Sequence, residues 1–245
     1  MIVRLIQVRT EAFLREHEIE CVLRSSGLHL EECQPFDALA RPLTLDVLDG
    51  ADAVIIGGSG EYSATGQSPL HDALEAVIRE CYERRLPLLG LCFGHHMMAR
   101  ALGGKVVTDK HRSETGTVRI DMLPTAGHDP LVGHLPAMFF AAQGHNDSVI
   151  ELPTTLENLA TSERSPCQLL FAPGRPFYGL QFHPELRLED LKQRLAHYGY
   201  LDSEERRESL GDLRDSPPEV QDILRRFVEI FVNPSTRKKS GQQAS

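Results

Sequence analysis

Short apolar runs alternate with longer amphipathic segments along the first hundred residues. The apolar runs at 53–56 and 88–91 carry no charge, as is typical of interior parallel strands. Between them, apolar residues recur at helical spacing, which predicts an amphipathic helix. Strands are expected at residues 1–8, 28–33, 53–56 and 88–91, with helices at 11–24, 70–85 and 95–102. This strand, helix, strand alternation predicts an α/β fold with a parallel, doubly wound sheet.

The pattern changes after residue 104, where short strands follow one another with little helix between them. Such a run predicts an antiparallel part of a mixed sheet. The strands are expected at residues 105–108, 117–122, 138–142, 157–161, 168–172 and 177–182.

The C-terminal region returns to a helical pattern. Apolar residues between Val220 and Phe231 form a stripe that we expect to pack back on the sheet. Residues 202–217 are rich in charge and predict a solvated helix or linker. We expect one domain over residues 1–233 and a disordered polar tail over 234–245.

Composition narrows the class of protein. The net charge of −9 argues against nucleic acid as a partner, because its recognition requires a basic face. The chain has no apolar run of 18 residues, so no membrane span is expected, and the short N-terminal apolar run is unlike a signal peptide. The five cysteines are an odd number without a C-x-x-C pair, which favours the reducing cytoplasm.

The apolar run at 88–91 leads directly into Gly90-Leu91-Cys92-Phe93-Gly94. Glycines two residues either side of one reactive side chain are typical of a nucleophile elbow, where neighbouring Cβ atoms would collide. The sulfur would lie at a helix N-terminus, where the dipole and unpaired N–H groups favour a thiolate. Cys92 is therefore a candidate nucleophile, and the alternative from these residues alone is a buried, inert cysteine.

A thiolate nucleophile requires a base, and the base requires an orienting group. The apolar strand at 177–182 ends at His183-Pro184-Glu185, where the proline stops the strand. Proline also fixes the backbone between the two polar residues, so the Glu185 carboxylate can turn back toward the imidazole. Cys92 and His183 lie far apart in the chain, so the fold must bring them together.

These two motifs together resemble the class I, or triad, glutamine amidotransferase family, and within it the stand-alone proteins related to the amidotransferase domain of GMP synthase. Further segments agree with the resemblance, namely Ile55-Ile56-Gly57-Gly58-Ser59, Glu114-Thr115-Gly116 and Gln143-Gly144-His145-Asn146-Asp147. The resemblance implies a three-layer, flavodoxin-like fold with a mostly parallel central sheet and an antiparallel extension.

The resemblance also implies a reaction, in which Cys92 attacks the side-chain carbonyl of glutamine. His183 would pass a proton to the departing ammonia, Glu185 would orient the imidazole, and water would release glutamate from the thioester. The backbone N–H groups of Gly58 and Phe93 would form the oxyanion hole. No cofactor is expected.

The histidines next to the nucleophile raise two questions. The family motif usually carries Gln at the position of His96, so His96 is a candidate substrate-binding residue whose different shape leaves the acyl donor open. Neighbouring helical residues point about 100° apart, so His95 and His96 are not expected to chelate a metal. His145 and Asp147 are expected to support the site entrance rather than to form a second dyad.

Three functional interpretations remain. The first is hydrolysis of glutamine, with a separate synthetase chain as the acceptor of ammonia, since no ATP-binding loop follows residue 185. The second keeps the same triad and changes the acyl donor to a γ-glutamyl peptide or conjugate. The third is a regulatory subunit with a vestigial amidase site, and an unreactive Cys92 thiol would favour it.

Overall fold

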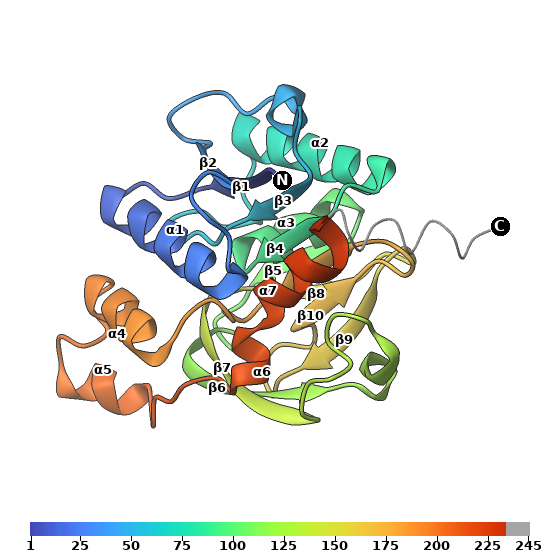
Figure 1. Ribbon diagram of the computed structural model, residues 1–245. Helices are drawn as coiled ribbons and strands as arrows, with labels where there is room; N and C mark the ends of the chain where they lie inside the picture. Colours follow the sequence, from blue (N-terminus) through green and yellow to red (C-terminus); the bar gives the residue numbers. More distant parts are fainter. Residues whose placement is uncertain (234–245) are drawn as a thin grey trace.

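A nine-stranded mixed sheet forms the centre of the computed structural model, which describes residues 1–233 (Figure 1). Its strands are β1 (Val3–Gln7), β2 (Cys33–Asp37), β3 (Ala53–Ile56), β4 (Leu88–Leu91), β6 (Glu114–Met122), β7 (Met138–His145), β9 (Glu157–Thr161), β10 (Leu169–Phe171) and β11 (Phe177–Leu180). Strands β5 (Lys105–Thr108) and β8 (Asp147–Glu151) form a separate antiparallel pair. The longer helices are α1 (Ala12–Ser26), α2 (Pro69–Arg84), α3 (Phe93–Ala101) and α4 (Leu188–His197).

Shorter helical segments complete the chain. They are η1 (Leu45–Leu48), η2 (Pro124–His128), α5 (Glu204–Ser209), α6 (Pro218–Gln221), α7 (Ile223–Phe227) and the π-helical turn η3 (Val228–Val232). The predicted polar tail at 234–245 lies outside the described residues.

The strand order is β2-β1-β3-β4-β11-β10-β9-β6-β7. Pairing is parallel from β2 through β11 and antiparallel from β11 to β7. The mostly parallel sheet with an antiparallel extension is therefore confirmed. Because β11 runs parallel to β4 and beside it, the residues that follow both strands emerge at one edge of the sheet.

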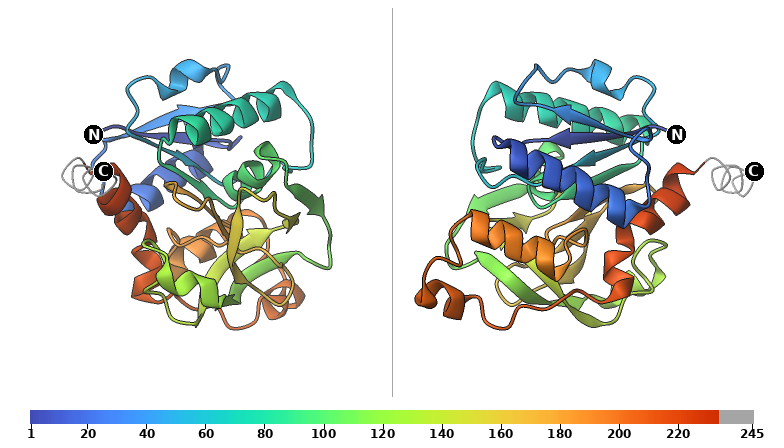
Figure 2. Two further views of the ribbon diagram at one scale, coloured as in Figure 1. Left: turned by 90° about the vertical axis from the view of Figure 1, so that its right-hand side faces the viewer. Right: turned by 60° about the vertical axis from the view of Figure 1, so that its left-hand side comes forward.

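Alternation along the strands divides the core between two faces. Leu5 and Ile55 point to the face covered by α1 and α7, whereas Ile6 and Ile56 point to the face covered by α2 and α3. Figure 2 shows these helices on opposite sides of the sheet. The C-terminal apolar stripe joins the first face, with Phe227 fully buried, so its predicted packing is confirmed.

Several predicted boundaries were wrong. The second strand was expected at 28–33 but lies at Cys33–Asp37, because the His29 carbonyl accepts hydrogen bonds from the backbone of Glu32 and Cys33 and holds a turn there. Pro35 is tolerated inside β2 because β2 is an edge strand. The strand at 105–108 pairs with β8 outside the main sheet, and neither β8 nor α4 was predicted from the sequence.

Candidate active site

Cys92 lies between β4 and α3 in a strained backbone conformation. Its φ of 49° and ψ of −96° place a non-glycine residue in a region that is rarely populated. Its N–H donates to the Leu180 carbonyl of the neighbouring strand at 2.7 Å, which holds the turn against β11. A Cβ on Gly94 would collide with the Ile56 carbonyl, and one on Gly90 would lie 2.6 Å from the Gly94 carbonyl carbon. The sharp turn therefore depends on both glycines.

The three residues predicted to act together lie side by side at the edge of the sheet. His183 follows β11, and its N–H donates to the Ala142 carbonyl at 2.9 Å. Its ring forms a side-chain hydrogen bond with Cys92. On the other side of the ring, Nδ1 is 2.7 Å from Glu185 Oε1. The three side chains form one continuous chain of contacts.

This contact chain sets the charge state of the imidazole. Burial lowers the pKa of His183, but the Glu185 carboxylate and the hydrogen bond to Cys92 outweigh burial and raise it to about 9. Burial likewise raises the pKa of Glu185, but the His183 charge, their hydrogen bond and Arg194 lower it to about 2. His183 therefore retains a proton at neutral pH, beside both the sulfur and an ionised carboxylate.

Gln181 connects the nucleophile to His96. The Gln181 amide donates to Cys92 Sγ at 3.7 Å, and its Oε1 accepts from His96 Nε2 at 2.5 Å. Both side chains are nearly inaccessible to solvent. Burial and the neighbouring His145 lower the pKa of His96 to about 4, so the His96 ring is neutral at pH 7.

The two N–H groups expected in the oxyanion hole differ in their surroundings. Phe93 is the first residue of α3, so its N–H has no acceptor within the helix. The Gly58 N–H donates to Glu18 Oε1 at 3.1 Å. Glu18 is itself held by Arg9 Nη2 at 3.1 Å and is buried. The structure therefore brings Gly58 to the site with its N–H already paired.

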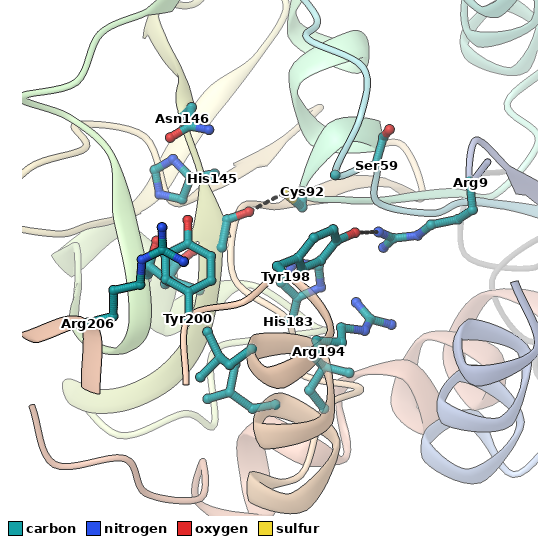
Figure 3. A pocket seen from close by; sticks show the side chains of 17 residues that line it. Arg9, Ser59, Cys92, His145, Asn146, His183, Arg194, Tyr198, Tyr200 and Arg206 are labelled. Carbon is teal, nitrogen blue, oxygen red and sulfur yellow. Dashed lines mark hydrogen bonds between the residues drawn. The ribbon is translucent and has the colours of Figure 1, made fainter. Parts of the chain in front are cut away.

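Two cavities meet at Cys92. The smaller one has a volume of about 230 Å³ and extends past Phe93 and His96. The larger one has a volume of about 400 Å³ and extends past His183 toward α4 and α5 (Figure 3). Ser59, Gly60, Gly144, His145 and Asn146 line both cavities.

His145 and Asp147 support the entrance of the site through the loop at 59–66 and the strands beside it. The His145 ring is 2.9 Å from Glu114 Oε2 and 2.8 Å from the Asp147 carbonyl. Asp147 accepts from the Ala64 N–H at 2.7 Å and from the Ser63 hydroxyl at 2.8 Å. Neither side chain joins the contact chain of Cys92, His183 and Glu185.

One group of side chains under α4 has the spacing of metal ligands. His17, Cys21 and Asp190 place ligand atoms within 4.8 Å of one another. Asp190 pairs with Arg24, and Arg194 Nε lies 3.3 Å from His17 Nδ1. The two guanidinium groups supply the positive charge that a cation would bring, so the donor set does not fit a metal.

Sequence patterns missed several residues of this site. Gln181 could have been found, because it shares with His183 one face of a strand that is otherwise apolar. The pairing of Arg9 with Glu18 carries no local signal, since the two residues belong to β1's end and to α1. The residues that α4 and α5 contribute were also missed.

Comparisons with known proteins agree with this geometry. The sequence model of the family "Glutamine amidotransferase class-I" matches residues 17–202. GMP synthase [glutamine-hydrolyzing] of Phenylobacterium zucineum is 34% identical over 173 residues, which are 67% of this chain and 29% of that protein. A separate subunit of GMP synthase [glutamine-hydrolyzing] in Methanopyrus kandleri is 32% identical over 145 residues, which are 59% of this chain and 72% of that protein. The chain thus spans under a third of the first relative and most of the second.

Solved structures show the same fold. A glutamine amidotransferase from Thermotoga maritima superimposes with a TM-score of 0.70 at 22% identity, covering 95% of this chain and 98% of that one. A protein from Thermoplasma acidophilum, described as a GMP synthase subunit, gives a TM-score of 0.69 at 23% identity and covers 98% of both chains. Among residues 1–233, no helix combines the length and apolar character that a bilayer crossing requires.

Proposed function

Because the chain belongs to the class-I glutamine amidotransferase family, we propose that it hydrolyses L-glutamine to glutamate and ammonia through a thioester on Cys92. The observation that carries the proposal is the contact chain from Cys92 through His183 to Glu185 at a strained turn. A spectator cysteine has no need of such a turn or of a buried ion pair beside its sulfur.

Each residue of this chain has one role in the proposed reaction. Cys92 Sγ attacks the side-chain carbonyl carbon, and the oxygen becomes an oxyanion beside the Phe93 N–H, which the Gly58 N–H would join. His183 gives its proton to the amide nitrogen, the C–N bond breaks and ammonia leaves. Water then gives a proton to His183, attacks the thioester and releases glutamate with the thiolate. Glu185 keeps the imidazolium oriented and charged.

Release of glutamate from L-glutamine tests the proposal. Cys92→Ala removes the nucleophile and should abolish release, whereas Cys33→Ala, at a buried thiol on β2, should retain it. Hydroxylamine added to the wild-type reaction should divert the thioester to γ-glutamyl hydroxamate. A Cys92 thiol that resists alkylation at neutral pH, together with absent turnover, would instead favour the vestigial site.

The use of the ammonia is a second part of this proposal. The relatives that are named as single subunits of GMP synthase support a separate synthetase chain as its acceptor. Faster glutamine hydrolysis on addition of a candidate synthetase chain would support it, and an unchanged rate would count against it. All five cysteines are free thiols, which supports a reducing compartment such as the cytoplasm.

A further inference from the structure

The two cavities that meet at Cys92 lie on different sides of the reacting bond. Phe93, whose N–H faces the expected oxyanion, lines only the smaller cavity. His183, which must protonate the departing nitrogen, lines only the larger one. An amide attacked by Cys92 therefore has its acyl part in the smaller cavity and its leaving group in the larger one.

The larger cavity far exceeds what glutamine needs on this side. Its volume is about 400 Å³, whereas a molecule the size of water or ammonia needs about 15 Å³. Pockets of about 300–1,000 Å³ are typical of sites for whole organic ligands. The volume indicates a leaving amine much larger than ammonia.

The walls of this cavity combine apolar surface with positive charge. Leu186, Leu191 and Leu195 line it together with the rings of Tyr198 and Tyr200. The charged lining side chains are arginines, and no aspartate or glutamate of residues 1–233 is among the lining residues. They are Arg9, Arg194 and Arg206. Figure 3 shows the Tyr198 ring in the middle of the pocket, with Arg9 on one side and Tyr200 and Arg206 on the other.

The wall is a packed part of the fold. Leu191 and Leu195 of α4 belong to a buried cluster with Cys21 of α1 and Ala142 of β7. Tyr198 is fixed at its hydroxyl, which accepts from Arg9 Nη1 at 3.4 Å. The cavity beside His183 is therefore built by α4 and the segment after it, and it is closed on the side away from Cys92.

We propose, on the basis of the hydrolysis proposed above, that this cavity is a leaving-group subsite for γ-glutamyl dipeptides. The released amino acid would place its apolar side chain on the leucines and tyrosines and its carboxylate in the field of the arginines. The C–S bond forms as the γ-amide C–N bond breaks, and His183 gives its proton to the α-amino nitrogen of the released amino acid. Water then cleaves the thioester, so the products are glutamate and an apolar amino acid.

Specificity constants for three substrates test the subsite. They are L-glutamine, γ-glutamyl-phenylalanine and the C-terminal amide of that dipeptide, which lacks only the carboxylate. We expect kcat/KM for the dipeptide to exceed that for glutamine by at least tenfold, and the C-terminal amide to lose about tenfold of this advantage. A tenfold ratio corresponds to about 1.4 kcal/mol, the size of one charge-assisted hydrogen bond.

A matched pair of variants separates the subsite from the general fold. Arg206 and Arg207 are neighbours on α5, and each donates to a carbonyl of residues 199–201. Arg206 lines the cavity and Arg207 does not. Arg206→Gln should lower the ratio of dipeptide to glutamine kcat/KM about tenfold, and Arg207→Gln should leave that ratio within twofold of wild type.

The outcomes separate the two proposals. Turnover of glutamine with equal or weaker turnover of both dipeptides would overturn the subsite and leave the amidohydrolase standing. Dipeptide turnover with a ratio insensitive to Arg206→Gln and to the terminal amide would overturn the carboxylate recognition. Absent turnover of every substrate by folded protein would overturn both proposals.

Discussion

Replacing Glu185 with glutamine removes the charge that keeps His183 protonated and keeps the shape of the side chain. The pKa of His183 is raised from 6.5 to about 9, and that of Glu185 is lowered from 4.5 to about 2. Each change corresponds to about 3 kcal/mol, at 1.36 kcal/mol for each factor of ten. The two values agree because they describe one ion pair from its two ends, so the pair is counted once.

The pH dependence of this stabilisation follows from the direction of each change. A raised pKa stabilises the folded state fully below 6.5, and this contribution is lost as the pH rises through 9. A lowered pKa stabilises it fully above 4.5, and this contribution is lost as the pH falls through 2. The difference in unfolding free energy between wild type and Glu185→Gln should therefore be largest between about pH 4.5 and 6.5, at about 3 kcal/mol, and should shrink toward pH 9.

Urea unfolding at several pH values measures this difference, and NMR titration of the His183 ring measures its pKa. In the variant, burial acts without its counter-charge, so the His183 pKa should fall to 6.5 or below. At pH 7 we expect kcat/KM to fall about a hundredfold, since about 3 kcal/mol of imidazolium stabilisation is lost. Glu189→Gln makes the same change at an exposed carboxylate that pairs with Lys192, and it should leave all three measurements unchanged. A wild-type His183 pKa near 6.5, or a stability difference that is constant with pH, would refute the reasoning.

Three further variants test the packing around the site. Gln181→Leu removes the donor to Cys92 Sγ and leaves the His96 N–H without its acceptor; steady-state kinetics should show kcat/KM lowered about tenfold and urea unfolding a loss of about 1–3 kcal/mol. Gly94→Ala forces a Cβ against the Ile56 carbonyl and should destabilise the protein by about 1–3 kcal/mol, whereas Gly127→Ala, with open space around it, should not change the urea midpoint. Glu18→Gln leaves the Arg9 charge buried without its partner, so thermal unfolding should show a loss of about 3–5 kcal/mol, while Glu16→Gln at the exposed face of α1 should show none.

The sheet could be predicted where hydrophobic periodicity and glycine punctuation act locally. Residues 53–56 and 88–91 are buried on both faces, so their sequences are uniformly apolar and both strands were found at their observed bounds. The pattern failed where partners decide the structure. Residues 147–151 form a strand because β5 lies beside them, and α4 forms where Asp190 accepts the Arg187 N–H at its start.

The candidate site divides in the same way. Cys92, His183 and Glu185 lie in local motifs whose residue types and spacing indicate their chemistry, so the sequence predicts them together. Arg9 and the residues of α4 and α5 reach the cavity through packing between distant segments, and no local pattern indicates that they meet. The interpretation that most depends on the third dimension is therefore the identity of the leaving group.

The oxyanion hole connects this packing to the chemistry. A Cβ on Gly58 would lie 3.3 Å from His183 Cε1, so its peptide is beside the reacting atoms, yet its N–H donates to the buried Glu18 carboxylate. A carboxylate in that place opposes a second negative charge, and one missing donor raises the barrier by about 3 kcal/mol. Two adjacent glycines, Gly57 and Gly58, allow this peptide to turn without the steric cost of a Cβ. Full activity of the site thus requires the Gly58 N–H to leave Glu18 when the acyl donor binds, and the ion pair with Arg9 gives Glu18 a partner that remains when it does.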